Sequence, residues 1–290
     1  MSNTFQTAEQ MASVAAAIAA KDLGLAQHVY RDVAADFRPG GGTTVNVPVP
    51  GVTTTSTRPV GSTADYALGQ ITETTIPVTL TTEAYSVVPV TLDESTLDVS
   101  NYSRQVLRPQ ALTVANHVNS AVASALAGAT PDATITYDPA NPRSAFIRAR
   151  AILRGRGVPA ETPIKAVVGS NVFADVLLAE ALDDQGRVGG IPVHENTRVD
   201  ADALYVFVTT AFVAAIRAPQ APDDAVFSAS VTVDDMALTL IKAFNPANGL
   251  TNSIVTAFIG VAPMPLPVAD YDTGTVDLVD GGGIVSITTV

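Results

Sequence analysis

The sequence predicts an α+β fold, in which helices and strands are concentrated in different parts of the chain. Three observations support this prediction. Apolar residues recur at helical spacing near the N-terminus and again over residues 109–127. Between these helices, over residues 43–92, apolar and polar residues alternate with the period of two that is typical of strands. After residue 135, short apolar strands alternate with short helices and turns.

Composition narrows the classes of function. Of the 290 residues, 47% are hydrophobic and 15% are charged, which excludes an intrinsically disordered chain. The sequence has no cysteine, which excludes a disulfide framework, a thiolate metal site and a catalytic thiol. The net charge of −12 disfavours a basic nucleic-acid groove. Neither a run of ~18 apolar residues nor a secretory signal is present, so we expect a soluble, cytoplasmic chain. Because the chain is apolar for its charge, we also expect a partner to cover part of its surface.

The first helix is expected to begin at a capping box. Thr7 and Gln10 have the spacing at which each side chain bonds the other residue's backbone N–H. The apolar stripe that follows runs to about Val33 and consists of Met11, Val14, Ile18, Leu25 and Val29. The Pro-Gly-Gly-Gly sequence at 39–42 ends this segment, which is either an ordinary core helix or an arm that extends from the domain.

Residues 43–92 predict a long β-hairpin ribbon with a flexible tip. The apolar positions of its two arms are Val45, Val47 and Val49, then Ile76, Val78 and Leu80, with the alternation continuing to Leu92. The segment 53–69 between them is rich in Thr, Gly and Ser, which favours turns. Arms of about a dozen residues would project about 40 Å. Because a two-stranded ribbon has no second layer to cover its apolar face, this face lies either on the chain's own core or on a neighbouring copy.

The remaining elements follow from the same rules. Pro109 suits the first turn of a long helix that closes at Gly128, and residues 143–154 form a second helix. Strands are expected over 164–168, 191–194, 204–208, 231–244 and 253–261, with one helix after Ser170 or Asn171 and a short helix over 211–216. Residues 276–278 and 284–290 are expected to form a small β element.

No motif points to catalysis. The three histidines fall on separate elements without a second ligand at metal-binding spacing, and they are His28, His117 and His194. The sequence contains neither a phosphate-binding loop nor a nucleophile elbow. Adjacent acidic pairs at 93–94, 183–184, 223–224 and 234–235 point their side chains apart and are expected to be solvated. We therefore expect no catalytic, cofactor or metal site.

Arginine is concentrated in one stretch of the chain. The members of this cluster are Arg143, Arg148, Arg150, Arg154 and Arg156. Nucleic acid and acidic segments of neighbouring subunits are both suitable partners for such a cluster, and we favour the second.

Several stretches carry a resemblance to a known family. They are Val29–Asp32 with Gly42–Pro48, Val90–Glu94 with Arg108–Leu112, Arg156–Pro159, Ala166–Ser170, and Gly190–Asn196 with Ala211–Phe212. Their order and spacing over about residues 20–265 resemble the major capsid (coat) proteins of tailed double-stranded DNA phages. These proteins have the Hong Kong 97 (HK97)-like fold, and the resemblance is to the P22-coat-like branch.

The resemblance implies an organisation of the chain. It comprises an N-arm (1–38), an extended loop or E-loop (39–90), a P domain with the long spine helix (91–135), an A domain (136–250), a return strand to the P domain (251–264) and a C-terminal β tail (265–290). The tail has no counterpart that we identify in the family. The implied function is that of a subunit that self-assembles, as hexamers and pentamers, into an icosahedral shell around double-stranded phage DNA.

The family also implies contacts and partners. Inter-subunit contacts are expected on the E-loop and arm, at Val45, Val47, Val49, Arg58, Asp65, Tyr66, Ile76, Val78 and Leu80. Further implied partners are a portal protein, a separate scaffolding protein, a decoration protein in some shells, and packaged DNA bound without sequence specificity; no membrane is involved. The expected location is the virion capsid, assembled in the host bacterial cytoplasm. Residues 39–90 contain no lysine, so the Lys–Asn cross-link of some family members is not expected.

Other functions stay open from the sequence. An encapsulin-like bacterial compartment shares the shell fold, and its contents distinguish it from a virus. A β-rich surface or tail adhesion protein would also suit the Thr- and Val-rich strands, although the long helix and the missing secretion signal weigh against it. A metal-free hydrolase would require a pocket in which acid, base and nucleophile converge.

Overall fold

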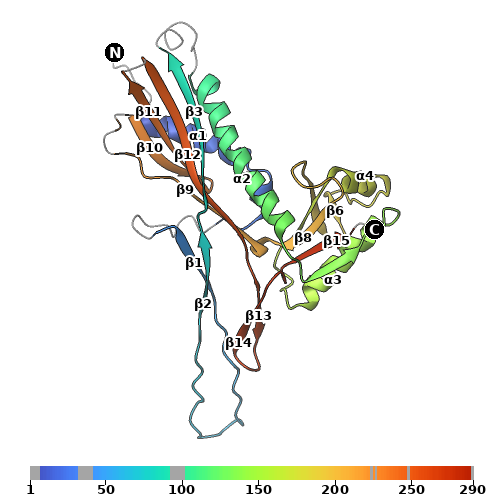
Figure 1. Ribbon diagram of the computed structural model, residues 1–290. Coiled ribbons are helices and arrows are strands. Elements are labelled where there is room, and N and C mark those ends of the chain that lie inside the picture. Colours follow the sequence, from blue (N-terminus) through green and yellow to red (C-terminus); the bar gives the residue numbers. More distant parts are fainter. Residues whose placement is uncertain are drawn as a thin grey trace. The chain divides into compact units, whose positions relative to one another are not determined.

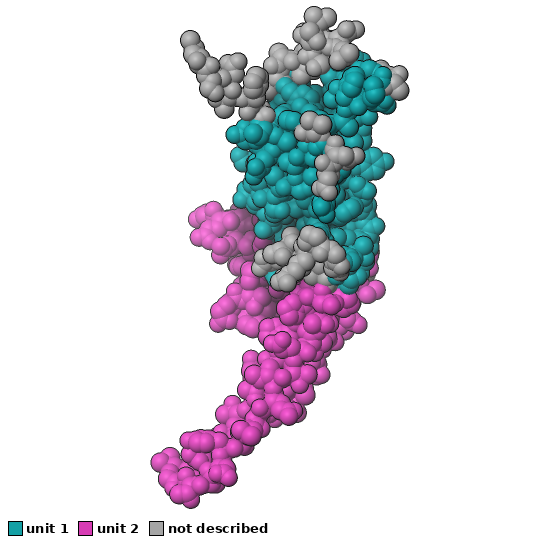
Figure 2. All heavy atoms as spheres, turned by 90° about the vertical axis from the view of Figure 1, so that its left-hand side faces the viewer, with its two compact units in different colours: residues 1–45, 78–125, 213–262 teal, residues 46–77, 126–212, 263–290 magenta. Residues whose placement is uncertain are grey.

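The computed structural model describes residues 7–31, 42–91, 102–222, 225, 227–246 and 249–288. The chain divides into two compact units, shown in Figure 2. Unit 1 comprises Met1–Val45, Val78–Ala125 and Val213–Ala262, and unit 2 comprises Asn46–Pro77, Leu126–Phe212 and Pro263–Val290. The glycine-rich break at 39–41 and the acidic pairs at 93–94 and 223–224 lie outside the described residues.

Unit 1 begins with helix α1 (Ala8–Lys21), whose predicted capping box is present: the Gln10 N–H donates to Thr7 Oγ1 (3.2 Å) and the Thr7 N–H donates to Gln10 Oε1 (3.1 Å). The helix is shorter than expected, because a turn at 22–24 leads into the separate 3-10 helix η1 (Leu25–His28). Its buried face also differs from the predicted stripe. It is formed by Met11 and five alanines, whereas Val14 is 45% exposed.

Unit 1 contains an antiparallel sheet in the order β10–β11–β12–β3 (Figure 1). These strands are β10 (Phe227–Val233), β11 (Met236–Asn245), β12 (Leu250–Pro263) and β3 (Thr82–Thr91), and β9 (Phe212–Arg217) also pairs with β12.

Two predictions are wrong in this region. The expected short helix over 211–216 is a strand after a 3-10 turn, η5 (Thr209–Ala211), because five consecutive buried residues of β9 line the core. The single strand expected over 231–244 is a hairpin, since Asp234 and Asp235 adopt positive φ of 49° and 61°, which Asp tolerates better than most residues.

Helix α2 (Arg108–Gly128) confirms the predicted long helix and follows a π-helical turn, η4 (Ser103–Leu107). Its buried Gln110 donates to the carbonyls of Ser86 (2.9 Å) and Ser253 (2.8 Å) and accepts from the Ser253 hydroxyl. Lys242 pairs with Ser253 in register, so both side chains lie on one face of the sheet. Because Lys242 Nζ lies 3.9 Å from the Met11 sulfur, α1 and α2 cover that same face.

The buried Asn119 and the half-buried Lys242 join the segments of unit 1. Asn119 on α2 donates to the Asp22 carbonyl (2.9 Å) and accepts from the N–H groups of Leu25 and Ala26, which fixes the start of η1. Lys242 Nζ lies 3.3 Å from the centre of the Tyr102 ring. Burial lowers the pKa of Lys242 from 10.5 to about 8.

Unit 2 contains a six-stranded sheet in the order β4–β15–β8–β5–β7–β6. The strands are β4 (Ala133–Thr136), β5 (Ile164–Val168), β6 (Arg187–Val188), β7 (Ile191–Glu195), β8 (Leu204–Val208) and β15 (Ile284–Thr288). Helices α3 (Pro142–Gly155) and α4 (Ser170–Leu178) share one core with the alternate residues of β5 and β8, so both helices cover the same face. The C-terminal strand β15 lies inside this sheet, parallel to β4 and antiparallel to β8, and is therefore an integral part of the unit.

Candidate subunit-contact surface

The predicted ribbon is present but shorter than expected. Strands β1 (Thr44–Val49) and β2 (Thr74–Thr79) form a two-stranded sheet, joined by the Thr44 and Thr79 hydroxyls at 3.1 Å. After Leu80 the chain leaves the ribbon, because the Thr81 N–H donates to the Ile259 carbonyl (3.0 Å) and β3 joins the unit 1 sheet. The alternation over 76–92 therefore belongs to two strands in two sheets, and local periodicity could not show this division.

The apolar row of the ribbon is partly covered by the chain itself. Val49 and Val78 are buried, with exposed fractions of 6% and 0%, and Val47, Ile76 and Leu80 are half-buried. The side chain of Val45 lies outside the described residues. Val49 and Val78 are therefore covered within the chain itself, and the inter-subunit contact expected at the ribbon stays a prediction.

Residues 50–73 connect the two strands as an extended loop without regular secondary structure. The legs of this loop run close together at two glycines. A Cβ atom on Gly51 would clash with the Thr72 carbonyl, and a Cβ atom on Gly69 would clash with the Thr53 hydroxyl. At Gly51 the clash is with backbone, so only glycine permits that approach, and the two legs of the loop lie close together at both positions.

The loop tip is held by local contacts. The Arg58 guanidinium lies 3.9 Å from the centre of the Tyr66 ring and donates to the Ala64 carbonyl. The Ala64 N–H in turn donates to the Ser62 hydroxyl (3.2 Å). Three of the predicted contact residues, Arg58, Asp65 and Tyr66, are exposed at this tip. A cation–π contact at an exposed site contributes about 0.5–1 kcal/mol, so it shapes the tip without burying it.

Four large apolar side chains of the loop are mostly exposed in the single chain. Their exposed fractions are 106% for Val60, 77% for Tyr66, 96% for Leu68 and 64% for Ile71. We call these four residues the exposed loop side chains. Val60, Leu68 and Ile71 were missed by sequence reasoning because they are isolated within a turn-forming segment. Large apolar residues in such a segment are the signal that could have found them.

A second hairpin supports one leg of the loop. Strands β13 (Leu266–Asp270) and β14 (Thr275–Val279) are joined by a turn in which Gly274 has φ +71°. A Cβ atom on Gly274 would lie 3.0 Å from Thr54 Cγ2, so the turn and the leg are in contact. Asp270 accepts hydrogen bonds from Thr273 and from the Asp272 N–H, and these bonds lower its pKa. The carboxylate thus stabilises the turn that contacts the loop.

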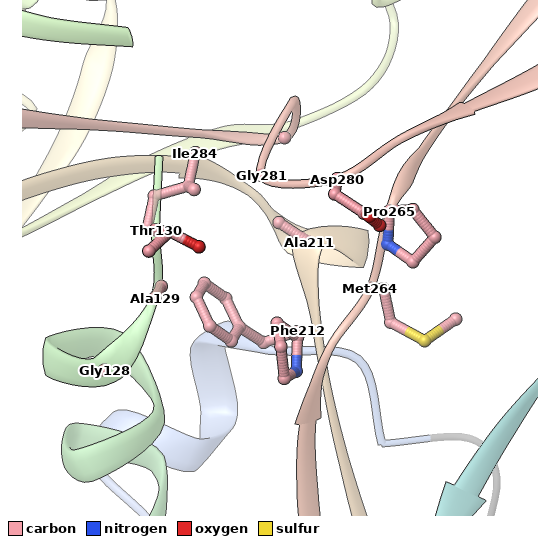
Figure 3. Close-up of a pocket in the computed structure, with 12 residues that line it drawn as sticks. Gly128, Ala129, Thr130, Ala211, Phe212, Met264, Pro265, Asp280, Gly281 and Ile284 are labelled. Atoms are coloured by element: carbon pink, nitrogen blue, oxygen red, sulfur yellow. The ribbon is translucent and has the colours of Figure 1, made fainter. Parts of the chain in front are cut away.

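One candidate pocket lies within unit 2 and is shown in Figure 3. This cavity of about 240 Å³ is bounded by the end of α2, Phe212 at the start of β9, Met264 before β13, and the turn before β15. Asp280 is its one titratable lining residue, so the cavity brings no acid, base and nucleophile together.

The histidines and carboxylates do not form a metal centre in the described part of the chain. No group of three or more potential metal-binding side chains occurs there. The three histidines lie on separate elements, as expected; burial lowers the pKa of His194, with a smaller effect from Lys165. Among the described helices, none is both long and apolar enough to span a membrane.

No known protein-family profile and no curated protein matches the sequence. Solved structures do match it. A chain of Mycobacterium phage Che8 is 14% identical and has a TM-score of 0.59, covering 91% of this chain and 90% of that chain. The capsid of cyanophage P-SCSP1u is 10% identical with a TM-score of 0.56, covering 100% and 90%. A virus-like particle from Pyrococcus furiosus is 11% identical with a TM-score of 0.56, covering 96% and 98%.

These similarities extend over nearly the whole of each chain, so they concern the complete architecture and not a shared motif. At this level of identity they establish the fold alone. The chain has the HK97-like α+β fold of phage capsid subunits, which confirms the fold class predicted from the sequence.

Proposed function

We propose that this chain is a phage major capsid protein, a structural subunit that self-assembles as hexamers and pentamers into an icosahedral shell enclosing double-stranded DNA. The observation that carries the proposal is the set of exposed loop side chains on a capsid-type fold. Val60 and Leu68 are almost completely exposed in the single chain. Burying one Leu-sized side chain contributes about 1.5–3 kcal/mol, and in a shell every subunit makes this contact.

The proposed shell defines a location and partners. The subunit assembles in the host bacterial cytoplasm and becomes part of the virion capsid. Its main partner is itself, and the shell also contacts a portal protein, a separate scaffolding protein during assembly and, where the phage has one, a decoration protein. The net charge of −12 supports an inner surface that holds DNA without strong phosphate binding.

The compact units suggest a revised domain assignment. We assign the E-loop to residues 46–77 and the A domain to 126–212 with 263–290, in place of 39–90 and 136–250. The strands β9 to β12 support this revision because residues 213–262 cluster with the segment that carries most of the spine helix. The C-terminal β tail then belongs to the A domain, since β15 is an inner strand of its sheet.

Expression of the chain by itself tests the proposal. Negative-stain microscopy should show polyhedral shells, tubes or curved sheets, and a protein that stays monomeric at high concentration would contradict the proposal. Particles from the native source should contain nuclease-protected double-stranded DNA. Particles that contain a packaged enzyme instead would identify a bacterial compartment.

A further inference from the structure

An arginine-lined groove lies at one edge of the unit 2 sheet. Its lining includes Arg150 and Arg154 from α3, Arg187 from β6 and a single carboxylate, Glu161. The groove also contains the residues at the amino ends of β5 and β7, among them Ile164 and Ile191. Because these two strands are parallel, their amino ends lie side by side, and the groove is at these ends.

Two of the three arginines of this groove, Arg150 and Arg154, are held in place by backbone carbonyls. Arg150 donates to the Gly189 carbonyl (2.8 Å), and Arg154 donates to the carbonyls of Ala160 and Thr162 (3.0 Å each). Carbonyl bonds position a guanidinium but do not neutralise its charge. The nearby carboxylate of Asp183 accepts from the N–H groups of Gln185 and Arg187, which stabilises the turn before β6. The groove therefore keeps an excess of positive charge.

The opposite edge of the same sheet is acidic. Glu195 ends β7, and the loop from β7 to β8 carries Asp200 and Asp202, all three exposed. This loop is fixed beside the carboxyl end of β5, where the Gly169 N–H donates to the Ala203 carbonyl (2.9 Å). Asp138, which follows the parallel strand β4, adds a further exposed carboxylate. Arg143 and Arg198 are also near this edge, and the carboxylates outnumber them.

We propose that the arginine groove of one subunit binds the acidic edge, residues 195–202, of the next subunit in a ring. The two charged surfaces lie at opposite ends of strands five residues long, about 13 Å apart. A surface at one end of a domain that fits a different surface at the other end makes a head-to-tail contact, which closes into a ring when identical subunits repeat it. This inference rests on the proposed capsid function and names the charged groups that join neighbours within a hexamer or pentamer.

Charge reversal tests the contact. The variant Arg150→Glu with Arg187→Glu, and separately Glu195→Arg with Asp200→Arg, should each raise the critical concentration for assembly by about tenfold or more. Combining all four substitutions should restore assembly towards wild type. Arg148→Glu, on the same helix but outside the groove, and Asp277→Arg, on β14, are single-charge controls that should change assembly little. Thermal unfolding of each unassembled variant shows whether the fold is retained.

Cross-linking provides a second test that does not depend on energetics. The chain contains no cysteine, so Arg187→Cys with Asp200→Cys places two thiols on an otherwise unreactive background. Treatment of assembled protein with a short bis-maleimide should give a ladder of covalent multimers. Either single-cysteine variant should give none, but a mixture of the two should give dimers.

The outcomes separate this inference from the proposed function. If the wild-type chain assembles but the reversed variants assemble equally well, or no ladder forms, the contact is wrong and the capsid proposal stands. If the four-residue swap fails to restore assembly although its fold is retained, the pairing of these two surfaces is wrong. If the wild-type chain does not assemble under any condition, both proposals are overturned.

Discussion

Leu68 offers the most direct test of the loop as a contact surface. Its side chain is 96% exposed in the single chain, so Leu68→Ser should leave the stability of the unassembled subunit unchanged within about 0.5 kcal/mol. If a neighbouring subunit buries this side chain, the substitution removes about 2 kcal/mol from each contact. Since 1.4 kcal/mol corresponds to a factor of ten, the critical concentration for assembly should rise about thirtyfold.

The assay measures the pelletable fraction over a series of protein concentrations, together with thermal unfolding of the unassembled protein. Leu178→Ser on α4 is the matched control, because that leucine is 85% exposed but lies outside the loop. Assembly of Leu68→Ser at the wild-type concentration would refute the reasoning. An equal effect of the two substitutions would show that loss of any exposed leucine, and not the loop, matters.

Three further predictions concern the fold. Asn119→Leu removes the acceptor of the buried Leu25 and Ala26 N–H groups and should lower the free energy of unfolding by about 3 kcal/mol in denaturant titration, whereas Ser120→Ala should not. Ser286→Pro removes an N–H from an inner strand and should lower the melting temperature by roughly 10 °C, against little change for Ser286→Thr. The folded-state pKa of Lys242, about 8, is below its unfolded value of 10.5, so the folded chain binds fewer protons between these values and its stability should rise from pH 8 to 10. Lys242→Met should abolish that rise, and a variant that kept the wild-type pH profile would show that the half-buried ammonium group does not cause it.

Local signals predicted the elements that depend on neighbouring residues. The capping box at Thr7, the long helix ending at Gly128 and the strand at 164–168 all follow from spacing, caps and alternation within short windows. The exposure of the loop tip also agrees with its composition, because turn-forming residues favour the surface; the inter-subunit role of Arg58, Asp65 and Tyr66 came from the family resemblance and stays a prediction.

The remaining features depend on contacts between distant parts of the chain. The hairpin between β10 and β11 is an exception, because its local signal was present and was missed: the apolar period of two breaks at Asp234 and Asp235 and resumes one residue out of phase at Met236. No local pattern indicates that β15 inserts between β4 and β8. The contact of Gly274 with Thr54 joins residues about 220 positions apart. The burial of Val78, in contrast to the exposure of Leu68, is likewise decided by tertiary packing.

The net charge imposes opposite salt responses on the two proposed contacts. Subunits that each carry −12 repel one another, and at physiological ionic strength this repulsion is screened beyond about 8 Å. Added salt therefore favours the apolar loop contact, because it weakens the repulsion and leaves apolar burial intact. The same salt weakens attraction between the arginine groove and the acidic edge 195–202. Assembly of the two double charge-reversal variants, Arg150→Glu with Arg187→Glu and Glu195→Arg with Asp200→Arg, should consequently gain more from salt than assembly of Leu68→Ser. Only these double variants place like charges in direct contact.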